Sequence, residues 1–226
     1  MLNKTTGEIT RNLLVINGKI KKACQLYKKD KSKVNLIAVS KMQPAEKINQ
    51  AIAQGCRIFG ENYIKEAAEK WPEIRKKNPE IKLHFIGHLQ SNKAGDAVEL
   101  FDVIQTLDSE KLALVFQKEI TKRKKNPEFF VQVNVGEELQ KGGISPQDVE
   151  NFVKFSRQKC DLNVTGLMCI PPSEELASPY FALLAKLAKE NNLENLSMGM
   201  SLDFEEAIAL NANYIRIGTA IFGERK

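Results

Sequence analysis

Eight short apolar runs, each followed by a stretch with helical spacing, constrain the fold of this chain more than any other sequence feature. The runs are rich in β-branched residues, as expected for strands. The predicted strands lie near Asn35 to Val39, Arg57 to Phe59, Leu83 to Ile86, Val103 to Thr106, Phe129 to Asn134, Asn163 to Met168, Leu196 to Met198, and Tyr214 to Ile217. The predicted helices lie near Pro44 to Gln54, Tyr63 to Lys77, Asn92 to Leu100, Glu110 to Arg123, Pro146 to Arg157, Glu174 to Asn191, and Phe204 to Leu210.

Strict alternation of strands and helices predicts right-handed crossovers and a parallel sheet. Eight repeats favour closure into a (β/α)8 TIM barrel, and 226 residues suit that fold. No linker rich in Pro, Gly or Ser separates the repeats, so we expect residues 1–226 to form a single domain. An open doubly wound sheet would usually carry a glycine-rich phosphate loop after its first strand, where this chain has SKMQP.

An extra helix is predicted ahead of the first strand, over residues 3–29. Its apolar positions recur at helical spacing. They are Ile9, Leu13, Ile16, Ile20 and Cys24. We expect this amphipathic helix to pack against the barrel.

Several classes of protein are excluded by the composition. No run of about 18 apolar residues occurs, and the first residues, MLNKTTGEITRN, lack a hydrophobic signal region, so we expect a soluble cytoplasmic protein without membrane contact. The four cysteines are scattered and form no CxxC pair, so we interpret them as reduced packing residues. His84 and His88 lie four residues apart, but the intervening FIG looks like a strand end and the glutamate of an HExxH motif is absent. We therefore expect no metal site.

The net charge of +6 comes from 34 Lys and Arg against 28 Asp and Glu. The basic clusters fall in predicted helices or loops without interleaved aromatic residues. They are KIKK at 19–22, KKDKSK at 28–33, RKK at 75–77 and TKRKK at 121–125. We interpret them as solvated helix faces and expect no nucleic-acid partner.

The residues at the strand ends are the candidates for function, because the loops there converge on one cavity in a barrel. Lys41 ends the buried run LIAVSK and is the first candidate for chemistry. Asn62 follows the second strand and Met168 ends the sixth, so we include both among the expected binding residues. A lysine in such a place is either the partner of a nearby acid or a reactive amine.

The last two strands lead into segments with small residues, SMGMS at 197–201 and the end of YIRIGT at 214–219. Ser201, Gly218 and Thr219 would let backbone N–H groups and hydroxyls approach an anion, and barrels often bind phosphate in these two loops. Strand alternation places Arg216 on the same side as Gly218, about 6 to 7 Å deeper in the cavity. A buried arginine needs an acceptor, which a barrel carboxylate could also supply.

A phosphate site, a strand-end lysine and an inward arginine suggest a phosphorylated aldehyde that Lys41 holds as a Schiff base. Pyridoxal 5′-phosphate fits all three features. A Schiff-base aldolase acting on phosphosugars would use the same lysine and phosphate site, and stays open as an alternative.

Six blocks of sequence resemble a known family. They are AVSKMQPAEKI, FGENYIKEA, HFIGHLQSNK, GLMCIPP, SMGMSLDFEEAI and RIGTAIFGER. Together, and in this order over nearly the whole chain, they resemble the YggS/PROSC family of pyridoxal phosphate homeostasis proteins. The resemblance implies the barrel of the alanine racemase N-terminal domain, with the cofactor linked covalently to Lys41. It also implies that Ser201, Gly218 and Thr219 hold the phosphate and that Arg216 faces the pyridine nitrogen.

One position departs from the family pattern. The family commonly reads SKTKP where this chain reads SKMQP, so Gln43 stands in place of a second lysine. A role of that lysine, such as cofactor transfer, is therefore not implied here. Lys141, in QKGGI, matches another basic position of the family and is a candidate for a secondary contact with an anion or the cofactor.

Schiff-base formation requires an uncharged amine on Lys41. At the ordinary lysine pKa of about 10.4, roughly 1 amine in 2,500 is uncharged at pH 7, so we expect a lowered pKa. Arg216 at about 3 Å from the ring nitrogen would oppose its protonation by about 5 kcal/mol at an effective dielectric near 20. A neutral pyridine is a poor electron sink, which disfavours deamination chemistry.

These features favour a protein that sequesters pyridoxal phosphate, limits its free aldehyde and hands it to apoenzymes, without turning over substrate. A single-domain amino-acid racemase is the alternative. Racemases of this class need a second acid-base group, in that family a tyrosine from an added domain, and we expect no such domain after the eighth strand. Tyr63 lies nearest a strand end, but we expect it to begin the second helix and pack there. No exposed apolar stripe is evident, so we expect a monomer.

Overall fold

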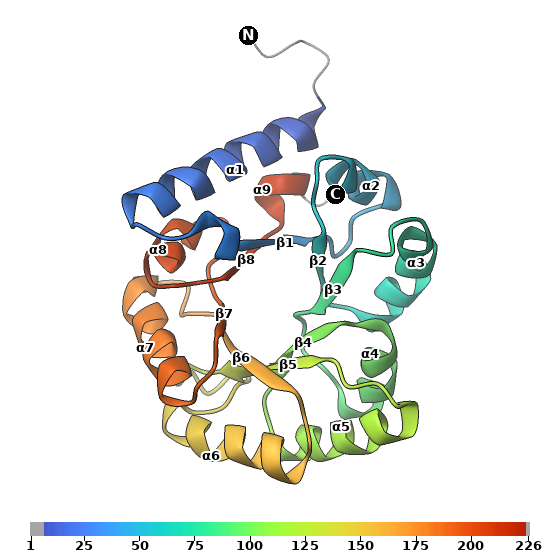
Figure 1. The fold of residues 1–226 in the computed structure, drawn as a ribbon, viewed down its shortest axis with the longest axis vertical. Coiled ribbons are helices and arrows are strands. Elements are labelled where there is room, and N and C mark those ends of the chain that lie inside the picture. Colours follow the sequence, from blue (N-terminus) through green and yellow to red (C-terminus); the bar gives the residue numbers. More distant parts are fainter. Residues whose placement is uncertain (1–6, 225–226) are drawn as a thin grey trace.

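A computed structural model describes residues 7–224 and contains a closed barrel of eight parallel strands. Figure 1 looks along the barrel and shows the strands as an inner ring with helices around it. The strands are β1 (Asn35–Val39), β2 (Ile58–Glu61), β3 (Lys82–Phe85), β4 (Val103–Leu107), β5 (Glu128–Val133), β6 (Val164–Cys169), β7 (Asn195–Ser197) and β8 (Tyr214–Ile217). They follow one another in chain order, and β1 pairs with both β2 and β8. The predicted (β/α)8 fold is confirmed.

The helices of the described residues follow the strands, apart from α1, which precedes them. They are α1 (Glu8–Leu26), α2 (Ala45–Ala53), α3 (Ile64–Lys77), α4 (Ala94–Leu100), α5 (Glu110–Arg123), α6 (Val149–Lys154), α7 (Ala177–Glu190), α8 (Phe204–Ala209) and α9 (Thr219–Phe222). The extra N-terminal helix is confirmed, although it is shorter than the predicted 3–29. Residues 3–6 of that prediction lie outside the described residues.

Apolar residues on the outer face of the sheet pack against the surrounding helices. Phe59 of β2 contacts Trp71 of α3 with ring centroids 5.1 Å apart, and Phe129 of β5 contacts Phe116 of α5 at 4.8 Å. All four rings are fully buried. Each such ring removes 150–250 Å² from water, so this outer layer supplies much of the hydrophobic stabilisation.

The inside of the barrel is more polar than this outer layer. Strand alternation turns Arg216, Ser197, Gln105 and His84 inward, and all four are buried. Barrel interiors usually hold branched aliphatic side chains. The polar side chains therefore identify the interior as the place where this barrel departs from a purely structural core.

Helix α1 covers the short C-terminal helix α9, and Figure 1 shows it along the outside of α9 and α8. Asn12 of α1 donates a hydrogen bond to the Ile221 carbonyl at 2.9 Å, and Lys47 of α2 donates to the Phe222 carbonyl at 2.6 Å. The last carbonyls of a helix have no partner within it. Side chains from two other helices therefore fix α9 against the end of β8.

Two element boundaries differ from the prediction in ways that matter for the site. Strand β2 runs on to Glu61, and β6 runs on to Cys169. Met168 is thus a strand residue and does not end its strand. None of the helices formed by residues 7–224 combines the length and apolar character that a membrane span requires.

Candidate functional site

The carboxyl ends of β1 and β8 lie in direct contact. Parallel pairing aligns Ala38 with Ile217, and a Cβ added to Gly218 would stand 3.3 Å from both Cβ and the carbonyl oxygen of Val39. Lys41 follows Val39 by two residues. The structure therefore brings the segment that carries the predicted reactive lysine next to the predicted phosphate loop.

The loop after β7 lies beside the same strand end, because the backbone N–H of Arg216 donates to the Gly199 carbonyl at 3.0 Å. Gly199 has φ +88°, and an added Cβ would stand 2.5 Å from Cβ of Ala207. Only glycine combines that backbone conformation with so little space. The tight turn carries Ser201, which is half-buried, toward the end of β8, where Thr219 begins α9.

Arg216 is a buried cation without a carboxylate beside it. Its side chain is 5% exposed, and it donates to Ser197 Oγ at 2.8 Å and to the Cys169 carbonyl at 2.8 Å. Within residues 7–224, no carboxylate oxygen lies within 4.0 Å of the guanidinium. Burial lowers the pKa of Arg216, which Cys169 and Asp203 partly offset, yet a guanidinium stays protonated in proteins.

A salt bridge was the alternative interpretation of Arg216, and the described residues do not supply one. Two of the five guanidinium N–H donors are occupied by neutral oxygens. A buried charge held only by neutral partners is costly to keep. The Arg216 guanidinium is therefore well suited to donate to an electron-rich atom of a ligand.

The turn that carries Lys41 is held by a network of charges on the helix side of β1 and β2. Glu61 is fully buried and accepts from Ser40 Oγ at 2.6 Å and from Trp71 Nε1 at 3.0 Å. Lys70 pairs with Glu61 at 2.8 Å and also donates to the Ser40 carbonyl at 2.8 Å. Burial raises the pKa of Glu61, and the charge of Lys70 acts in the opposite direction. Ser40 is thus held toward the helices, and the half-exposed Lys41 follows it in the turn after β1.

Asn62 and Met168 lie in different surroundings, Asn62 directly after β2 and Met168 near the end of β6. Asn62 follows β2, and its Oδ1 is buried without a hydrogen-bond partner in the described structure. Met168 is 1% exposed and packs inside the barrel against Val103 and Phe130. It pairs with Ser197 in the β6–β7 ladder, so Met168 lines the wall beside the partner of Arg216.

Lys141 lies in the loop after β5 and is already paired. Its Nζ lies 2.5 Å from Glu138 Oε2 and donates to the Pro171 carbonyl at 3.1 Å. These contacts join the loops after β5 and β6 at the mouth of the barrel. Gln43, in place of the family lysine, is 7% exposed, and its N–H closes the turn onto the Ser40 carbonyl at 3.1 Å.

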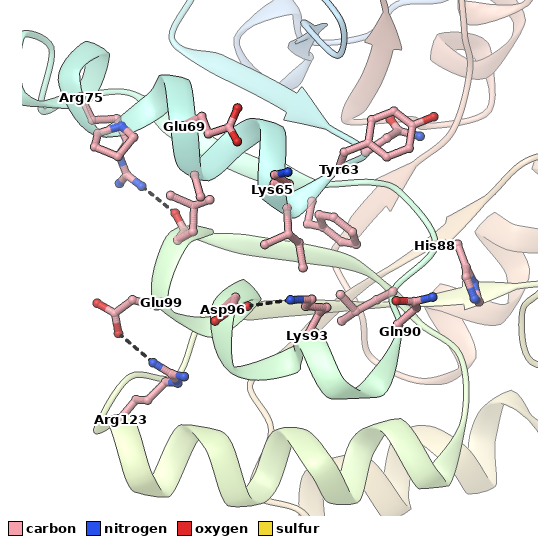
Figure 2. Close-up of a pocket in the computed structure, with 17 residues that line it drawn as sticks. Tyr63, Lys65, Glu69, Arg75, His88, Gln90, Lys93, Asp96, Glu99 and Arg123 are labelled. Carbon is pink, nitrogen blue, oxygen red and sulfur yellow. Dashed lines mark hydrogen bonds and ion pairs between the residues drawn. The ribbon is translucent and has the colours of Figure 1, made fainter.

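A groove of about 1280 Å³ lies beside this constellation, between α3 and α4. Figure 2 shows Arg75 at one end of the groove and His88 near the other, with Lys65 and Lys93 between them. It shares Asn62 with the strand-end site. The buried cation and the tight glycine turn instead lie at the ends of β7 and β8, so the candidate site is the mouth of the barrel.

Tyr63 also lines this groove. It directly precedes α3, as predicted, but it is 54% exposed, so the expectation that it packs into the structure is wrong. Figure 2 shows its ring beside the start of α3.

Sequence reasoning missed four side chains that shape the site. These are Lys70 on α3 and the interior residues Ser197, Gln105 and His84. The signal for the last three was a polar residue at an inward position of a strand. Lys70 gave no such signal, because a lysine on a helix resembles any solvated residue.

The comparisons with known proteins agree with this geometry. The family model described as alanine racemase, N-terminal domain, matches residues 12–226. A curated relative from Pasteurella multocida, named pyridoxal phosphate homeostasis protein, is 38% identical over an alignment that covers 96% of this chain and 97% of the relative. A relative of the same name from Bos taurus is 37% identical over 94% of this chain and 86% of its own length.

Solved structures show the same relationship. PipY of Synechococcus elongatus, determined with PLP bound, is 36% identical, superposes with a TM-score of 0.77, and covers 91% of this chain and 100% of its own. The alanine racemase of Clostridium difficile has a TM-score of 0.71 at 13% identity over 96% of this chain and 56% of the racemase, which shows a shared barrel fold. The chain therefore belongs to the family of pyridoxal phosphate homeostasis proteins, whose barrel is that of the alanine racemase N-terminal domain.

Proposed function

We propose that this protein binds pyridoxal 5′-phosphate, holds it through Lys41 as a Schiff base, and acts in cofactor homeostasis without turning over substrate. The observation that carries the proposal is Arg216, a buried cation held by two neutral oxygens beneath the ends of β7 and β8. The PLP-bound PipY and the names of the curated relatives support the same cofactor.

The residues at the strand ends fit the shape and charge of this cofactor. When bound, pyridoxal phosphate supplies an aldehyde that condenses with an amine, a pyridine nitrogen and a dianionic phosphate. The half-buried Ser201 and Gly218 and the first N–H groups of α9, at Thr219, would hold the phosphate. Arg216 lies deeper along β8, where it would face the ring nitrogen, and Asn62 and Met168 would line the walls.

Arg216 also disfavours deamination chemistry, although racemases of this barrel class work with such an arginine. A guanidinium has no acceptor for a hydrogen bond and cannot give up its proton, so it would keep the neighbouring ring nitrogen unprotonated. An unprotonated ring withdraws electrons poorly from a substrate. Lys41 would then retain the cofactor, and release to apoenzymes would follow by exchange of its amine for another.

The proposal extends to the whole chain. We propose that residues 1–226 form one domain, that the protein is a cytoplasmic monomer, and that Lys141 is a secondary contact for the cofactor or another anion. The last point requires Lys141 to leave Glu138, its present partner at 2.5 Å.

Borohydride reduction in the presence of pyridoxal phosphate, followed by peptide mapping, tests the proposal. Wild-type protein should be yellow and carry the reduced cofactor on Lys41, whereas Lys41→Ala should lose the visible band and the label. Lys189→Ala, at an exposed lysine of α7, is the matched control and should keep both. Labelling of another lysine would overturn the assignment of Lys41.

An amino-acid panel with the loaded protein tests the racemase alternative. Turnover at about 1 per second or faster would favour a racemase. A mixture of loaded protein with a pyridoxal-dependent apoenzyme tests delivery, and recovery of activity no faster than from free cofactor at the same concentration would count against direct transfer.

A further inference from the structure

A chain of hydrogen bonds crosses the barrel interior from β8 to β3. Arg216 Nη1 donates to Ser197 Oγ at 2.8 Å, and Ser197 Oγ lies 2.6 Å from Gln105 Oε1. Gln105 Nε2 lies 2.8 Å from His84 Nδ1. None of the four side chains is more than 5% exposed. The chain therefore joins four strands in a region closed to solvent.

Arg216 begins this chain as a donor, because a guanidinium can only donate. Ser197 Oγ accepts from Arg216 Nη1 and donates its own proton to Gln105 Oε1. The amide N–H of Gln105 is then left to donate to His84 Nδ1, which must be unprotonated. His84 is thus a neutral imidazole with its proton on Nε2, where no partner lies within the described part of the chain.

No member of the chain except Arg216 carries charge. A carboxylate at any of the other three positions would neutralise part of the guanidinium charge across one to three hydrogen bonds. Serine, glutamine and neutral histidine give Arg216 fixed acceptors and leave its charge intact.

We infer that Ser197, Gln105 and His84 are positioning residues that orient Arg216 toward the ring nitrogen of the cofactor and leave its positive charge unneutralised. The inference rests on the proposed function, since it names how the same site keeps the ring nitrogen unprotonated. Packed aliphatic residues would fill a barrel interior at least as stably as four polar ones. The polar chain therefore serves the orientation and charge of Arg216.

The first experiment uses the apoprotein. Nitrogen-15 NMR of labelled histidine should show His84 as the neutral tautomer with its proton on Nε2. In Gln105→Glu the amide donor becomes a carboxylate, so the His84 proton should move to Nδ1. His84 found protonated on Nδ1 in the wild type would overturn the direction of the chain, whatever the protein binds.

The second experiment uses protein loaded with nitrogen-15-labelled pyridoxal phosphate. The ring nitrogen should be unprotonated in the wild type, and Gln105→Glu should move its chemical shift toward the protonated value. Ser197→Ala removes the first link without adding charge, so it should keep the wild-type shift but bind the cofactor about 10-fold more weakly. If Ser197 and Gln105 served only the stability of the fold, the two variants would not differ in whether they change the protonation of the ring nitrogen or the affinity for the cofactor.

Thr106→Val is the matched control. Thr106 adjoins Gln105 on β4 and is 3% exposed, and its Oγ1 has no partner in the described structure. It should leave both the ring-nitrogen shift and the affinity within twofold of wild type. If Gln105→Glu and Ser197→Ala behave like this control while the wild type binds the cofactor, the inference is refuted and the proposed function still stands. Wild-type protein that binds no cofactor would overturn the proposed function, and this inference with it.

Discussion

Glu61 shows how a buried charge on the helix side of the barrel can control a residue on the other side. Its Oε1 accepts hydrogen bonds from Ser40 Oγ and Trp71 Nε1 and pairs with Lys70 Nζ. Its Oε2 has no hydrogen-bond partner within residues 7–224. Lys70 in turn bonds the Ser40 carbonyl, directly before Lys41. The backbone of the proposed Schiff-base lysine is therefore tied to one ion pair.

Replacing Lys70 with Met should destabilise the protein, because Glu61 would remain buried without its cation. Removing one partner of a buried pair costs about 3–5 kcal/mol, which is roughly 6–20 °C in melting temperature for a protein of this size. Thermal denaturation measures the loss.

Two further variants distinguish this mechanism from simple loss of packing. Lys70→Met combined with Glu61→Gln should recover much of the lost stability, since no buried charge remains. Lys186→Met, at an exposed pair with Glu190, should change the free energy of unfolding by less than about 1 kcal/mol. Equal melting temperatures for Lys70→Met and Lys186→Met would refute the proposed network.

His84 makes stability depend on pH in the acid range. Burial lowers its pKa to about 3, below the ordinary value of 6.5. Between these values the unfolded chain binds a proton that the folded protein excludes, so stability falls as pH falls, by about 1.4 kcal/mol per pH unit from this group. His84→Gln should therefore lose stability less steeply between pH 6 and pH 4.

Urea denaturation at a series of pH values checks this slope. The matched control is His88→Gln, at the exposed histidine after β3. It should keep the steep acid dependence, because the buried imidazole is still present. Parallel curves for wild type and His84→Gln would contradict a neutral, buried His84.

At the scale of the element, the loop after β7 is bonded directly to β8. The Gly199 carbonyl accepts from the Arg216 backbone N–H at 3.0 Å. Helix α9 is fixed in turn by Asn12 and Lys47 from α1 and α2. The residues predicted to bind phosphate are thus held in place by elements from both ends of the sequence.

Gly199→Ala should disturb this loop through both strain and crowding. The new Cβ would meet Cβ of Ala207 at 2.5 Å and Cα of Phe204 at 2.9 Å, in a backbone with φ +88°. We expect a loss of at least about 1–3 kcal/mol and weaker cofactor binding. Denaturation and cofactor titration measure the two effects.

Gly18→Ala is the control for this substitution. Gly18 lies inside α1, where an added Cβ meets nothing within 4 Å. Alanine favours a helix over glycine, so this variant should be more stable by about 0.8–1 kcal/mol with unchanged cofactor affinity. Normal stability and binding in Gly199→Ala would show that the tight turn is not required.

At the scale of the whole molecule, exposed apolar side chains collect in the loops at the barrel mouth. They are Met42, Tyr63, Leu139, Ile170, Leu176, Met200 and Leu202. The sequence showed no apolar stripe because these residues come from separate loops. The mouth is therefore the surface where a second copy or another protein would bury apolar area.

We still expect a monomer, since these residues come from separate loops and form no continuous apolar stripe. Sedimentation velocity at low and high micromolar concentration should give one species near 25.4 kDa. A species of twice this mass that Leu202→Asp converts to monomer would show instead that the mouth is a self-association surface. A dimer unaffected by Leu202→Asp would also refute the monomer and place the interface elsewhere.

The fold could be predicted from the sequence because periodicity is a local property. Alternating strand and helix signals specify a parallel sheet, and eight of them specify its closure. The boundaries were less certain, since β2 gains Glu61 and β6 gains Cys169. Chain order and strand ends were also sufficient to bring together Lys41, Arg216 and Gly218.

By itself, the sequence determined the barrel, the residue types at its mouth and the inward position of Arg216. Only the tertiary structure decided which side chains hold Arg216 and the backbone before Lys41 in place. Ser197 and Gln105 are 92 residues apart and meet through the closure and stagger of the barrel, which no periodicity encodes. Lys70 reaches Glu61 because α3 packs back on β2. Alternation fixes the side to which a residue points, but its partner depends on how distant strands and helices come together.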